Sequence, residues 1–507
     1  MNLVEQLVKA TQAAAERPAI VDGPSTVSYE QLGGAAGGFA AALAGAGASP
    51  GDRVAMLLRR GSDAAAAYLG TLAAGAVAVV VNEQLRPRQI EHIVSHSGAR
   101  VLLASGDVLD RLSRPLHVDA AVLDVEAARG SAPLSPVSRI EADVAQIVYT
   151  SGSTGLPKGV TLSHGNLRAG VGAVSTYLAL SAADRIASLL PFSFDYGLNQ
   201  LLCSVAVGAT LVVERSPVPA RVVNALRKQE VTVAAAVPPL WLQLLATESF
   251  RATPLPRLRA MTNSGGRLPT EAVRALRAAQ PRAELFLMYG LTEAFRSTYL
   301  DPDLVDAKPG SIGRAIPGAE ILVVDEEDRR CGPDEIGQLV HRGPTVSLGY
   351  WDDPETTARV YRPNPARAPG APAAERVVYS GDLVRRDADE DLHFVGRDDA
   401  MIKTLGYRVS PDEVSDVLYG SGQIVEAIVT AEPDELRGSR IVAHVVLSED
   451  GTLERLEAFA AEELPRYMQP QRFEVRSELI RTSSGKHDLS ATARGEHDLS
   501  ATPRGAG

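Results

Sequence analysis

The chain has 507 residues, of which 45% are hydrophobic and 22% are charged, and its formal net charge is −11. This length exceeds what one hydrophobic core usually serves, so we expect at least two domains. The negative charge argues against a surface that binds nucleic acid or anionic lipid. The two cysteines, Cys203 and Cys331, form no metal-binding spacing. They favour a reducing compartment, and we expect a cytoplasmic protein.

The first half of the chain alternates apolar strands with helical stretches. A helix precedes the strand at 18–21, and Ser28 is placed as the N-cap of the next helix. Residues 64–81 are nearly uncharged, but they are rich in Ala and Gly and end in a β-branched run. This composition favours a buried helix and a buried parallel strand over a membrane span. The alternation is typical of βαβ units and predicts an α/β fold with largely parallel sheets covered by helices.

A loop of small hydroxyl-bearing residues and glycines follows the apolar segment 145–148. It reads YTSGSTGLPKGV over residues 149–160. Such a loop turns backbone N–H groups and hydroxyls toward an anion, and Lys158 adds a mobile cation. A merely flexible loop is the alternative. Because the spacing of a Walker loop is absent, we predict a polyphosphate site of another kind, formed by Thr150, Ser151, Ser153, Thr154 and Lys158.

The loop resembles the phosphate-binding motif of the adenylate-forming (ANL) superfamily, which includes acyl-CoA synthetases, adenylation domains and luciferases. Further matches follow in the family's order and cover nearly the whole chain. The resemblance implies a large N-terminal domain of several subdomains at 1–398 and a small, mobile α+β C-terminal domain at 399–490. Residues 485–494 are repeated almost unchanged at 495–504. We therefore expect 491–507 to be a disordered, duplicated tail.

The segment 191–197, PFSFDYG, follows an apolar strand at its carboxyl end, where α/β proteins place ligand groups. The resemblance implies that Phe194, Asp195 and Tyr196 line the acyl pocket, with Asn263 from a later segment. Many acyl-CoA synthetases carry a histidine where Phe194 stands. The Phe-Asp pair instead resembles amino-acid-activating members, whose aspartate contacts the substrate ammonium. An ordinary hydrogen-bonded role for Asp195 at a strand end is equally open.

Three further motifs complete a nucleotide site by resemblance. Glycines in the segment 263–267, NSGGR, let a flat base approach the backbone. In the segment 289–293, YGLTE, the tyrosine can stack on adenine, Thr292 can donate to a phosphate and Glu293 can hold Mg²⁺. Asp382 is an acidic residue that follows a Gly turn, and the resemblance implies that it accepts hydrogen bonds from the ribose hydroxyls. The residues implied by these motifs are Gly265, Gly266, Tyr289, Gly290, Thr292, Glu293, Asp382 and Arg397.

The C-terminal part carries the moving elements that the resemblance implies. Asp399 matches the hinge about which the small domain rotates, with a surface carboxylate as the alternative. Gly406 and Arg408 match the loop that forms the channel for the pantetheine thiol, and Lys403 at the start of this loop is expected to be catalytic. Lys403 and Arg408 could meet anionic groups there, or could equally be solvated surface cations. Lys486, in the string TSSGK, matches the catalytic lysine. The second copy of the repeat has Glu496 at that position, which has the wrong charge.

Together these motifs predict an ATP- and Mg²⁺-dependent acid–thiol ligase, and we expect an acyl-CoA synthetase of fatty acid or secondary metabolism. Lys486 would bridge the carboxylate and the α-phosphate, while the loop at 149–160 would hold the leaving pyrophosphate. The thiol belongs to CoA or to the phosphopantetheine of a carrier protein. The first alternative is a stand-alone enzyme that loads an amino acid onto a carrier protein. Three other functions also stay open: an enzyme with one half-reaction, a luciferase-like oxidase and a non-catalytic binding module. The sequence does not identify the acid substrate or the oligomeric state.

Overall fold

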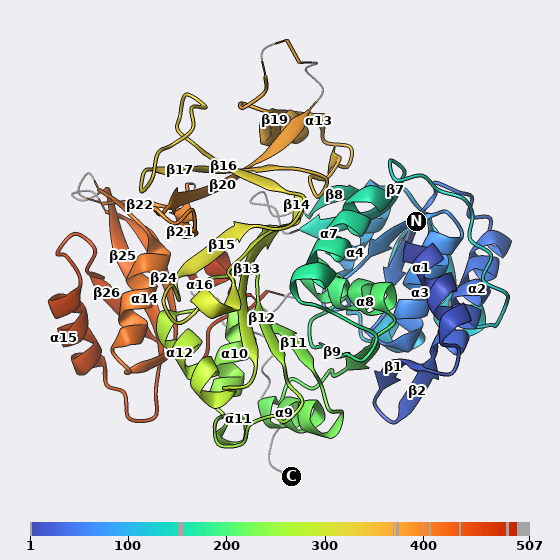
Figure 1. Ribbon diagram of the computed structural model, residues 1–507, viewed down its shortest axis with the longest axis horizontal. Coiled ribbons are helices and arrows are strands. Elements are labelled where there is room, and N and C mark those ends of the chain that lie inside the picture. Colours follow the sequence, from blue (N-terminus) through green and yellow to red (C-terminus); the bar gives the residue numbers. More distant parts are fainter. Residues whose placement is uncertain are drawn as a thin grey trace.

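The structure is a computed structural model that describes residues 3–150, 157–368, 370–371, 375–398, 400–404, 407–434, 438–482 and 486–493. The fold is mixed α/β, as the alternating pattern predicts. The elements follow the long axis of the molecule, with the first helices at one end and the last strands at the other (Figure 1). Two large sheets make up most of the chain, and two small sheets follow them in sequence.

The smaller of the two large sheets has seven strands. Its central strands are parallel, and the two strands at one edge are antiparallel. In spatial order the strands are β18 (Gly349–Tyr350), β8 (Lys158–Ser163), β7 (Val144–Thr150), β4 (Val77–Val80), β3 (Arg53–Leu57), β5 (Ala99–Ala104) and β6 (Ala121–Asp124). The helices between them are α2 (Tyr29–Gly45), α3 (Ser62–Ala73), α4 (Pro87–Ser97), α5 (Gly106–Leu109) and α6 (Val125–Ala128).

The larger sheet has fourteen strands, and their pairing changes from parallel to antiparallel near its middle. One part is parallel, apart from β2 at its edge: β2 (Ser25–Ser28), β1 (Pro18–Asp22), β10 (Thr210–Val213), β9 (Arg185–Ser188), β11 (Val233–Ala236), β12 (Ala260–Asn263) and β13 (Glu284–Leu291). The other part is antiparallel: β14 (Ala294–Tyr299), β15 (Ser311–Ala315), β21 (Leu392–Arg397), β20 (Arg376–Arg386), β17 (Ile336–Arg342) and β16 (Glu320–Val324), with β19 (Tyr361–Pro363) paired to β20.

Most helices of this region connect the parallel strands or precede them, whereas η1 and α13 lie among the antiparallel strands. The helices are α1 (Leu3–Ala13), α7 (His164–Tyr177), α8 (Asp195–Val207), α9 (Pro219–Lys228), α10 (Pro238–Leu245), α11 (Glu248–Arg251), α12 (Thr270–Ala279), the 3₁₀ turn η1 (Pro302–Leu304) and α13 (Pro354–Val360). Ser28 caps α2 as predicted. Its Oγ accepts a hydrogen bond from the Gln31 N–H at 3.2 Å, and its own N–H donates one to Gln31 Oε1 at 2.9 Å.

The stretch 64–81 is a buried helix and strand, as its composition predicts. Helix α3 is followed directly by β4, which pairs in parallel with β3 and β7. Leu69 of α3 is fully buried in the same hydrophobic core as Val54 of β3 and Ile186 of β9. The two large sheets therefore share one core. Among the residues described, no helix is long and apolar enough to cross a bilayer.

The described residues from Ala400 onward form two separate small sheets with their helices. The hairpin β22 (Ile402–Thr404) and β23 (Tyr407–Val409) precedes a three-stranded sheet of β24 (Ile424–Asp434), β25 (Gly438–Leu447) and β26 (Arg472–Val475). Helices α14 (Pro411–Gly420) and α15 (Leu453–Glu463) pack on this sheet around a core of their own, and α16 (Leu489–Ala493) follows. The predicted domain boundary at 398–399 falls between β21 and β22, and the assignment of Asp399 as the hinge stays a prediction, because this residue lies outside the described parts.

The segment 362–376 lies between two paired strands of the larger sheet. β19 occupies its start and pairs with β20, and the other described residues before Arg376 lie outside helices and strands. Asn364 is buried, and its amide donates to Glu375 Oε2 at 2.9 Å.

Candidate active site

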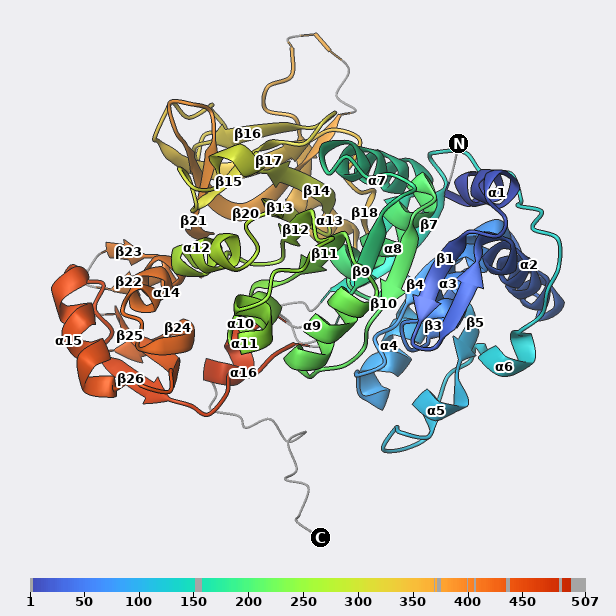
Figure 2. The same cartoon turned by 60° about the horizontal axis from the view of Figure 1, so that its bottom comes forward.

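The predicted site residues lie where the carboxyl ends of parallel strands meet the C-terminal elements. Strand β7 runs into the phosphate loop at Thr150, β9 precedes the 191–197 segment, and β12 ends at Asn263. Strand β13 carries Tyr289 and Gly290. Helix α14 and strand β24 of the small sheets contact α12 and α10 of the large region (Figures 1 and 2). Segments far apart in the sequence thus converge on one site, at the strand ends where open α/β sheets bind ligands.

Lys486 reaches this site from the C-terminal end of the chain. Its backbone carbonyl accepts a hydrogen bond from the Thr482 N–H at 2.7 Å. Its Nζ lies 4.9 Å from the centre of the Phe194 ring. Burial lowers the pKa of the Lys486 ammonium, and the charge of Asp195 is the largest opposing influence. The structure therefore brings Lys486 next to Phe194 and Asp195, although almost three hundred residues separate it from them in the sequence.

Gly265 allows this approach. It has a φ of +81°, and a Cβ added there would stand 2.9 Å from Lys486 Cε and 3.3 Å from Phe194 Cζ. The neighbouring Gly266 lies against Pro238 instead. The space above Gly265 is thus used by the lysine stem, whereas the sequence analysis assigned both glycines to adenine packing. Asn263 is buried, and its amide donates to the Gly266 carbonyl at 3.1 Å.

Asp195 is buried at the start of α8 and has a buried arginine beside it. Its Oδ1 accepts the Tyr196 N–H at 2.8 Å, and its Oδ2 lies 3.9 Å from Nη1 of Arg296. Arg296 also donates to the Asp195 carbonyl at 3.4 Å, and its guanidinium covers the Tyr196 ring at 4.9 Å. Tyr196 bonds through its hydroxyl to Thr262. The carboxylate that was considered as an ammonium contact is therefore already paired within the protein.

Glu293 is held by a tyrosine from a distant strand. The Tyr350 hydroxyl donates to Glu293 Oε1 at 2.6 Å. Burial, followed by the Glu293 charge, raises the pKa of Tyr350, so the hydroxyl stays a donor. Among the described residues, none forms a hydrogen bond or ion pair with the second carboxylate oxygen. One carboxylate with a free oxygen fits a Mg²⁺ ion whose other ligands are phosphate oxygens and water, and within the described parts no cluster of three metal-binding side chains occurs.

Lys158 points toward the start of α13. Its Nζ donates to Thr356 Oγ1 at 3.1 Å and lies 3.5 Å from Asp353 Oδ2. Asp353 also caps α13 through the Thr356 N–H. The ring of Tyr350 lies 6.0 Å from the same ammonium. Lys158 and Glu293 therefore meet the same short segment, 350–356, which the sequence analysis did not single out.

The residues matched to adenosine form a connected group. Tyr289 stacks on the buried ring of His341 at 5.9 Å, and its hydroxyl donates to Asp382. Arg397 donates to the other oxygen of Asp382 at 3.3 Å, and the two residues are direct partners across β20 and β21. Burial lowers the pKa of His341 to about 3, so this ring stays neutral. Tyr289 and the Asp382–Arg397 pair are thus placed for stacking and for ribose recognition, and those roles stay predictions.

Several predicted residues fall outside the described parts of the chain. These are Ser151, Ser153 and Thr154 of the phosphate loop, the hinge Asp399 and the channel residue Gly406, together with the side chains of Lys403 and Arg408. Thr150 is described at the end of β7, and Thr292 lies in the turn after β13. For all of these residues the functional assignments remain predictions.

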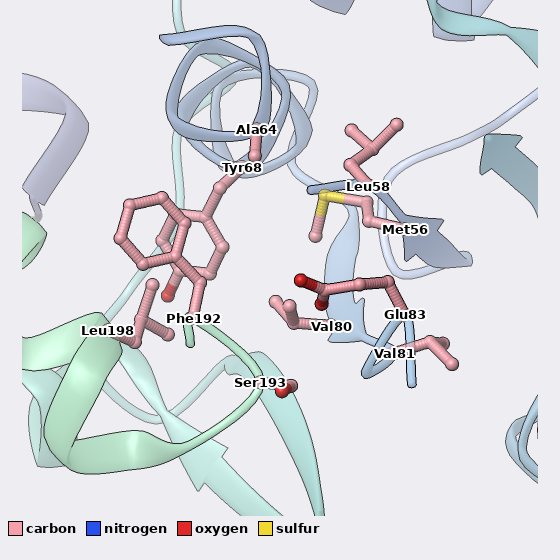
Figure 3. Close-up of a pocket in the computed structure, with 10 residues that line it drawn as sticks. All are labelled: Met56, Leu58, Ala64, Tyr68, Val80, Val81, Glu83, Phe192, Ser193 and Leu198. Carbon is pink, nitrogen blue, oxygen red and sulfur yellow. The ribbon is translucent and has the colours of Figure 1, made fainter. Parts of the chain in front are cut away.

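A small cavity adjoins the 191–197 segment without containing the predicted acyl-pocket residues. It is mostly apolar, and the Glu83 carboxylate points into it among Met56 and Val80 (Figure 3). Its lining residues are Met56, Leu58, Ala64, Tyr68, Val80, Val81, Glu83, Phe192, Ser193 and Leu198. The predicted acyl-pocket residues Phe194, Asp195 and Tyr196 follow Ser193 directly, so the cavity is a neighbour of that pocket.

Sequence reasoning missed three contributors to the site: Arg296, Tyr350 and Asp353. A single arginine in the otherwise apolar and hydroxyl-bearing run AFRSTYL, three residues after Glu293, was a usable signal for Arg296. Tyr350 and Asp353 carried no comparable signal, because their partners lie far away in the sequence.

Comparison with known proteins agrees with this geometry. The family model "AMP-binding enzyme" matches residues 7–351, and its "C-terminal domain" model matches 413–486. The chain is 29% identical to an L-proline–[L-prolyl-carrier protein] ligase of Pseudomonas fluorescens, over 96% of this chain and 98% of that protein. It is 28% identical to a long-chain-fatty-acid–CoA ligase of Salmonella typhimurium, over 96% and 93%.

Among solved structures, the anthranilate CoA ligase AuaEII in complex with anthranoyl-AMP has the same fold, with a TM-score of 0.88 over 99% of this chain and 98% of that one, at 24% identity. The relatives include ligases for both CoA and carrier proteins, so they establish the superfamily without separating its reactions. The family models together span most of the sequence. The chain therefore belongs to the AMP-binding enzymes of the adenylate-forming superfamily.

Proposed function

We propose that this protein is an AMP-forming acid–thiol ligase that activates a carboxylic acid with ATP and transfers the acyl group to the thiol of CoA. The observation that carries the proposal is the position of Lys486, whose ammonium reaches the Phe194 ring beside Asp195. A non-catalytic adenylate-binding module has no need for a buried cation there. An enzyme that joins a carboxylate to a phosphate does, because the two anions must be brought into contact.

In the first step, a carboxylate oxygen attacks the α-phosphorus of ATP, and the bond to the bridging oxygen of pyrophosphate breaks. Lys486 would lie between the carboxylate and the α-phosphate and offset their repulsion. Lys158 would leave Asp353 for the β- and γ-phosphates, and Glu293, fixed by Tyr350, would hold Mg²⁺. The metal would supply further neutralisation of the phosphates.

In the second step, the thiol sulfur attacks the acyl carbon, the thiol proton is lost, and AMP leaves with the bonding electrons. The thiol must therefore reach the acyl carbon, and Lys486 would lie beside that carbon in the present arrangement. A rotation of the C-terminal elements would withdraw the lysine, which is a gating movement of the kind that lids perform. The predicted hinge at Asp399 and the predicted channel at Gly406 and Arg408 would serve this step.

Loading of an amino acid onto a carrier protein is the second candidate, favoured by the likeness to the prolyl-carrier ligase. An ammonium would need the Asp195 carboxylate, but that group already has two partners: the Tyr196 N–H in the first turn of α8 and Arg296. The Arg296 guanidinium would repel a substrate ammonium placed beside it. This pairing supports acids without an amino group, and hence the CoA ligase.

Pyrophosphate release from ATP and Mg²⁺, measured over fatty, aromatic and amino acids, tests the first half of the proposal. Lys486→Ala should abolish release, while Lys9→Ala, which removes an exposed lysine, should leave it unchanged. Thioester formation is then measured with CoA and with a phosphopantetheine-bearing carrier protein. Activity restricted to amino acids and a carrier would favour the second candidate, and no release with any acid would contradict ligation.

A further inference from the structure

The guanidinium of Arg296 is buried with most of its hydrogen-bonding capacity unused. The side chain is 3% exposed, and Nε has no hydrogen-bond partner in the described structure. A guanidinium carries five N–H donors. Within the described residues, its one hydrogen bond is the 3.4 Å contact with the Asp195 carbonyl, and the Asp195 carboxylate lies at 3.9 Å, beyond hydrogen-bond distance. A buried group of this kind is costly unless something else completes its bonds.

The backbone at Arg296 is held in a conformation that residues with a side chain rarely adopt. Its φ is +79°, at the start of β14 where the pairing with β13 is irregular. Such positions persist where the surroundings enforce them, and they cluster at sites that bind ligands. Here the turn directs a strand residue onto the rings of Tyr196 and Phe295, at 4.9 and 5.2 Å. Arg296 is thus fixed on the predicted acyl pocket and not in the solvent.

Two aromatic rings connect Arg296 with the catalytic end of the pocket. Lys486 Nζ lies 4.9 Å from the Phe194 ring, the Phe194 and Tyr196 rings are 6.1 Å apart in an edge-to-face arrangement, and Arg296 covers Tyr196. The charge of Arg296 is near enough to lower the pKa of Lys486 further. An acid whose carboxylate meets Lys486 therefore has a second cation within reach of its other end.

A second buried polar atom without a partner lies on the same helix. Asn199 follows Asp195 by one turn of α8, so the two share a face. Asn199 is 1% exposed, and its Oδ1 has no hydrogen-bond partner among the described residues, while its amide contacts Cys203 Sγ at 3.4 Å. This region of α8 and β14 is therefore polar and incompletely bonded, which does not suit a purely hydrocarbon acyl chain.

We propose that Arg296 binds a second oxygen acceptor on the acid substrate, remote from the carboxylate that is activated. This inference rests on the proposed function, and it narrows the substrate to acids that carry a hydroxyl, carbonyl or second carboxylate group. The planar guanidinium donates to any of these oxygens, and it binds a carboxylate with two parallel bonds. Asp195 then acts as the counter-charge that orients Arg296.

The test compares acids matched in carbon skeleton: hexanoate with 6-hydroxyhexanoate and adipate, and benzoate with 4-hydroxybenzoate and terephthalate. The wild-type full-length protein should show kcat/KM for pyrophosphate release about 10- to 100-fold higher with an oxygen-bearing acid than with its plain partner, as expected for a hydrogen bond to a charged donor. In Arg296→Met this preference should vanish, and in Arg296→Gln it should persist in part. Equal rates for matched acids in the wild type would overturn the inference without any variant.

Arg259→Gln is the matched control. Arg259 is a partly buried arginine, and it donates from Nε and Nη2 to Asp184 at 2.8 Å each, in a separate ion pair. Its loss should lower stability and leave the preference among acids unchanged. A preference that survives in Arg296→Met, or that disappears equally in Arg259→Gln, would contradict a role for Arg296 in binding the substrate.

Calorimetric titration of the same acids, in the presence of a non-hydrolysable ATP analogue, separates the two proposals. Turnover without discrimination among matched acids would contradict the inference and leave the ligase function standing. Binding of the oxygen-bearing acids that depends on Arg296, without pyrophosphate release, would contradict the function and leave the inference standing. Neither binding nor turnover of any acid in the panel would overturn both.

Discussion

The hydroxyl of Tyr350 donates a 2.6 Å hydrogen bond to Glu293, the carboxylate predicted to hold Mg²⁺. Fifty-seven residues separate the two in the sequence. The bond fixes one carboxylate oxygen and leaves the other for the metal. Partners of this kind orient metal ligands, and their loss typically lowers metal affinity about 10- to 100-fold.

We therefore expect Tyr350→Phe to raise the Mg²⁺ concentration needed for half-maximal pyrophosphate release by about tenfold. The measurement is a Mg²⁺ titration at fixed ATP. Tyr361→Phe is the matched control, because Tyr361 packs edge-to-face on Tyr350 and bonds to Ser347. An equal shift in both variants would attribute the effect to packing.

Asp416 of α14 is expected to hold the C-terminal elements in the arrangement that places Lys486 in the site. Its carboxylate accepts bonds from Arg267 and from the Thr270 N–H at the start of α12, each at 3.1 Å. Asp416→Ala should lower acyl-adenylate formation about fivefold, as for a partly exposed ion pair worth about 1 kcal/mol. Thioester formation from a preformed acyl-adenylate should not fall.

Rapid-quench measurement of the two half-reactions checks this prediction. Arg274→Ala serves as the control, since Arg274 lies on α12, the helix that Asp416 contacts, and pairs with Glu271 on the surface. If Asp416→Ala slowed both half-reactions alike, the contact of Asp416 with α12 would contribute to general stability and would not favour the arrangement that forms the acyl-adenylate.

Gly265→Ala should displace Lys486 from the site. The new Cβ would stand 2.9 Å from Lys486 Cε, at a residue whose φ of +81° already disfavours a side chain. A displacement of about 1 Å can cost about 100-fold in rate, and we expect a loss of that order in acyl-adenylate formation. The measurement is single-turnover pyrophosphate release. Gly266→Ala, whose Cβ would meet Pro238 at 3.3 Å, should retain most activity, and similar losses in the two variants would argue against a contact specific to Lys486.

The pH dependence should report the environment of Lys486. Burial lowers the pKa of its ammonium, and Asp195, Glu293 and Asp382 oppose the shift. The reaction needs the charged form, so activity is full at pH values below the lowered pKa and is lost as the pH rises through it. In the free enzyme, kcat/KM for ATP should decline at a pH below the ordinary lysine value of about 10.4.

Asp195→Asn removes the largest opposing charge, so the decline should move to lower pH. Lys486→Arg should move it upward, because a guanidinium keeps its charge. A pH profile of initial rates at low ATP provides the measurement. A profile that Asp195→Asn leaves unchanged would contradict the influence of this carboxylate on Lys486.

The motifs that the sequence analysis used are local, and this explains what they could predict. The strand before the phosphate loop, the cap at Ser28, the helix and strand within 64–81 and the pairing of Asp382 with Arg397 all depend on neighbouring residues or on a hairpin register. Alternation of strands and helices indicated parallel sheets because a crossover of that length admits few other topologies. The assignment of Lys486 came from a five-residue string and its family resemblance.

Contacts between distant residues were decided by the tertiary structure alone. Asp195 is the clearest case, because its sequence context left an ammonium contact and a structural role equally open. Packing places Arg296, 101 residues away, against its carboxylate and its backbone carbonyl. Tyr350 with Glu293, and Asp353 with Lys158, are pairs of the same kind. The sequence by itself determined which chemical groups are present and in what order, since local spacing and turn chemistry are written in neighbouring residues. Which charges meet inside the pocket depends on how the sheets and the C-terminal elements pack, and no local pattern carries that information.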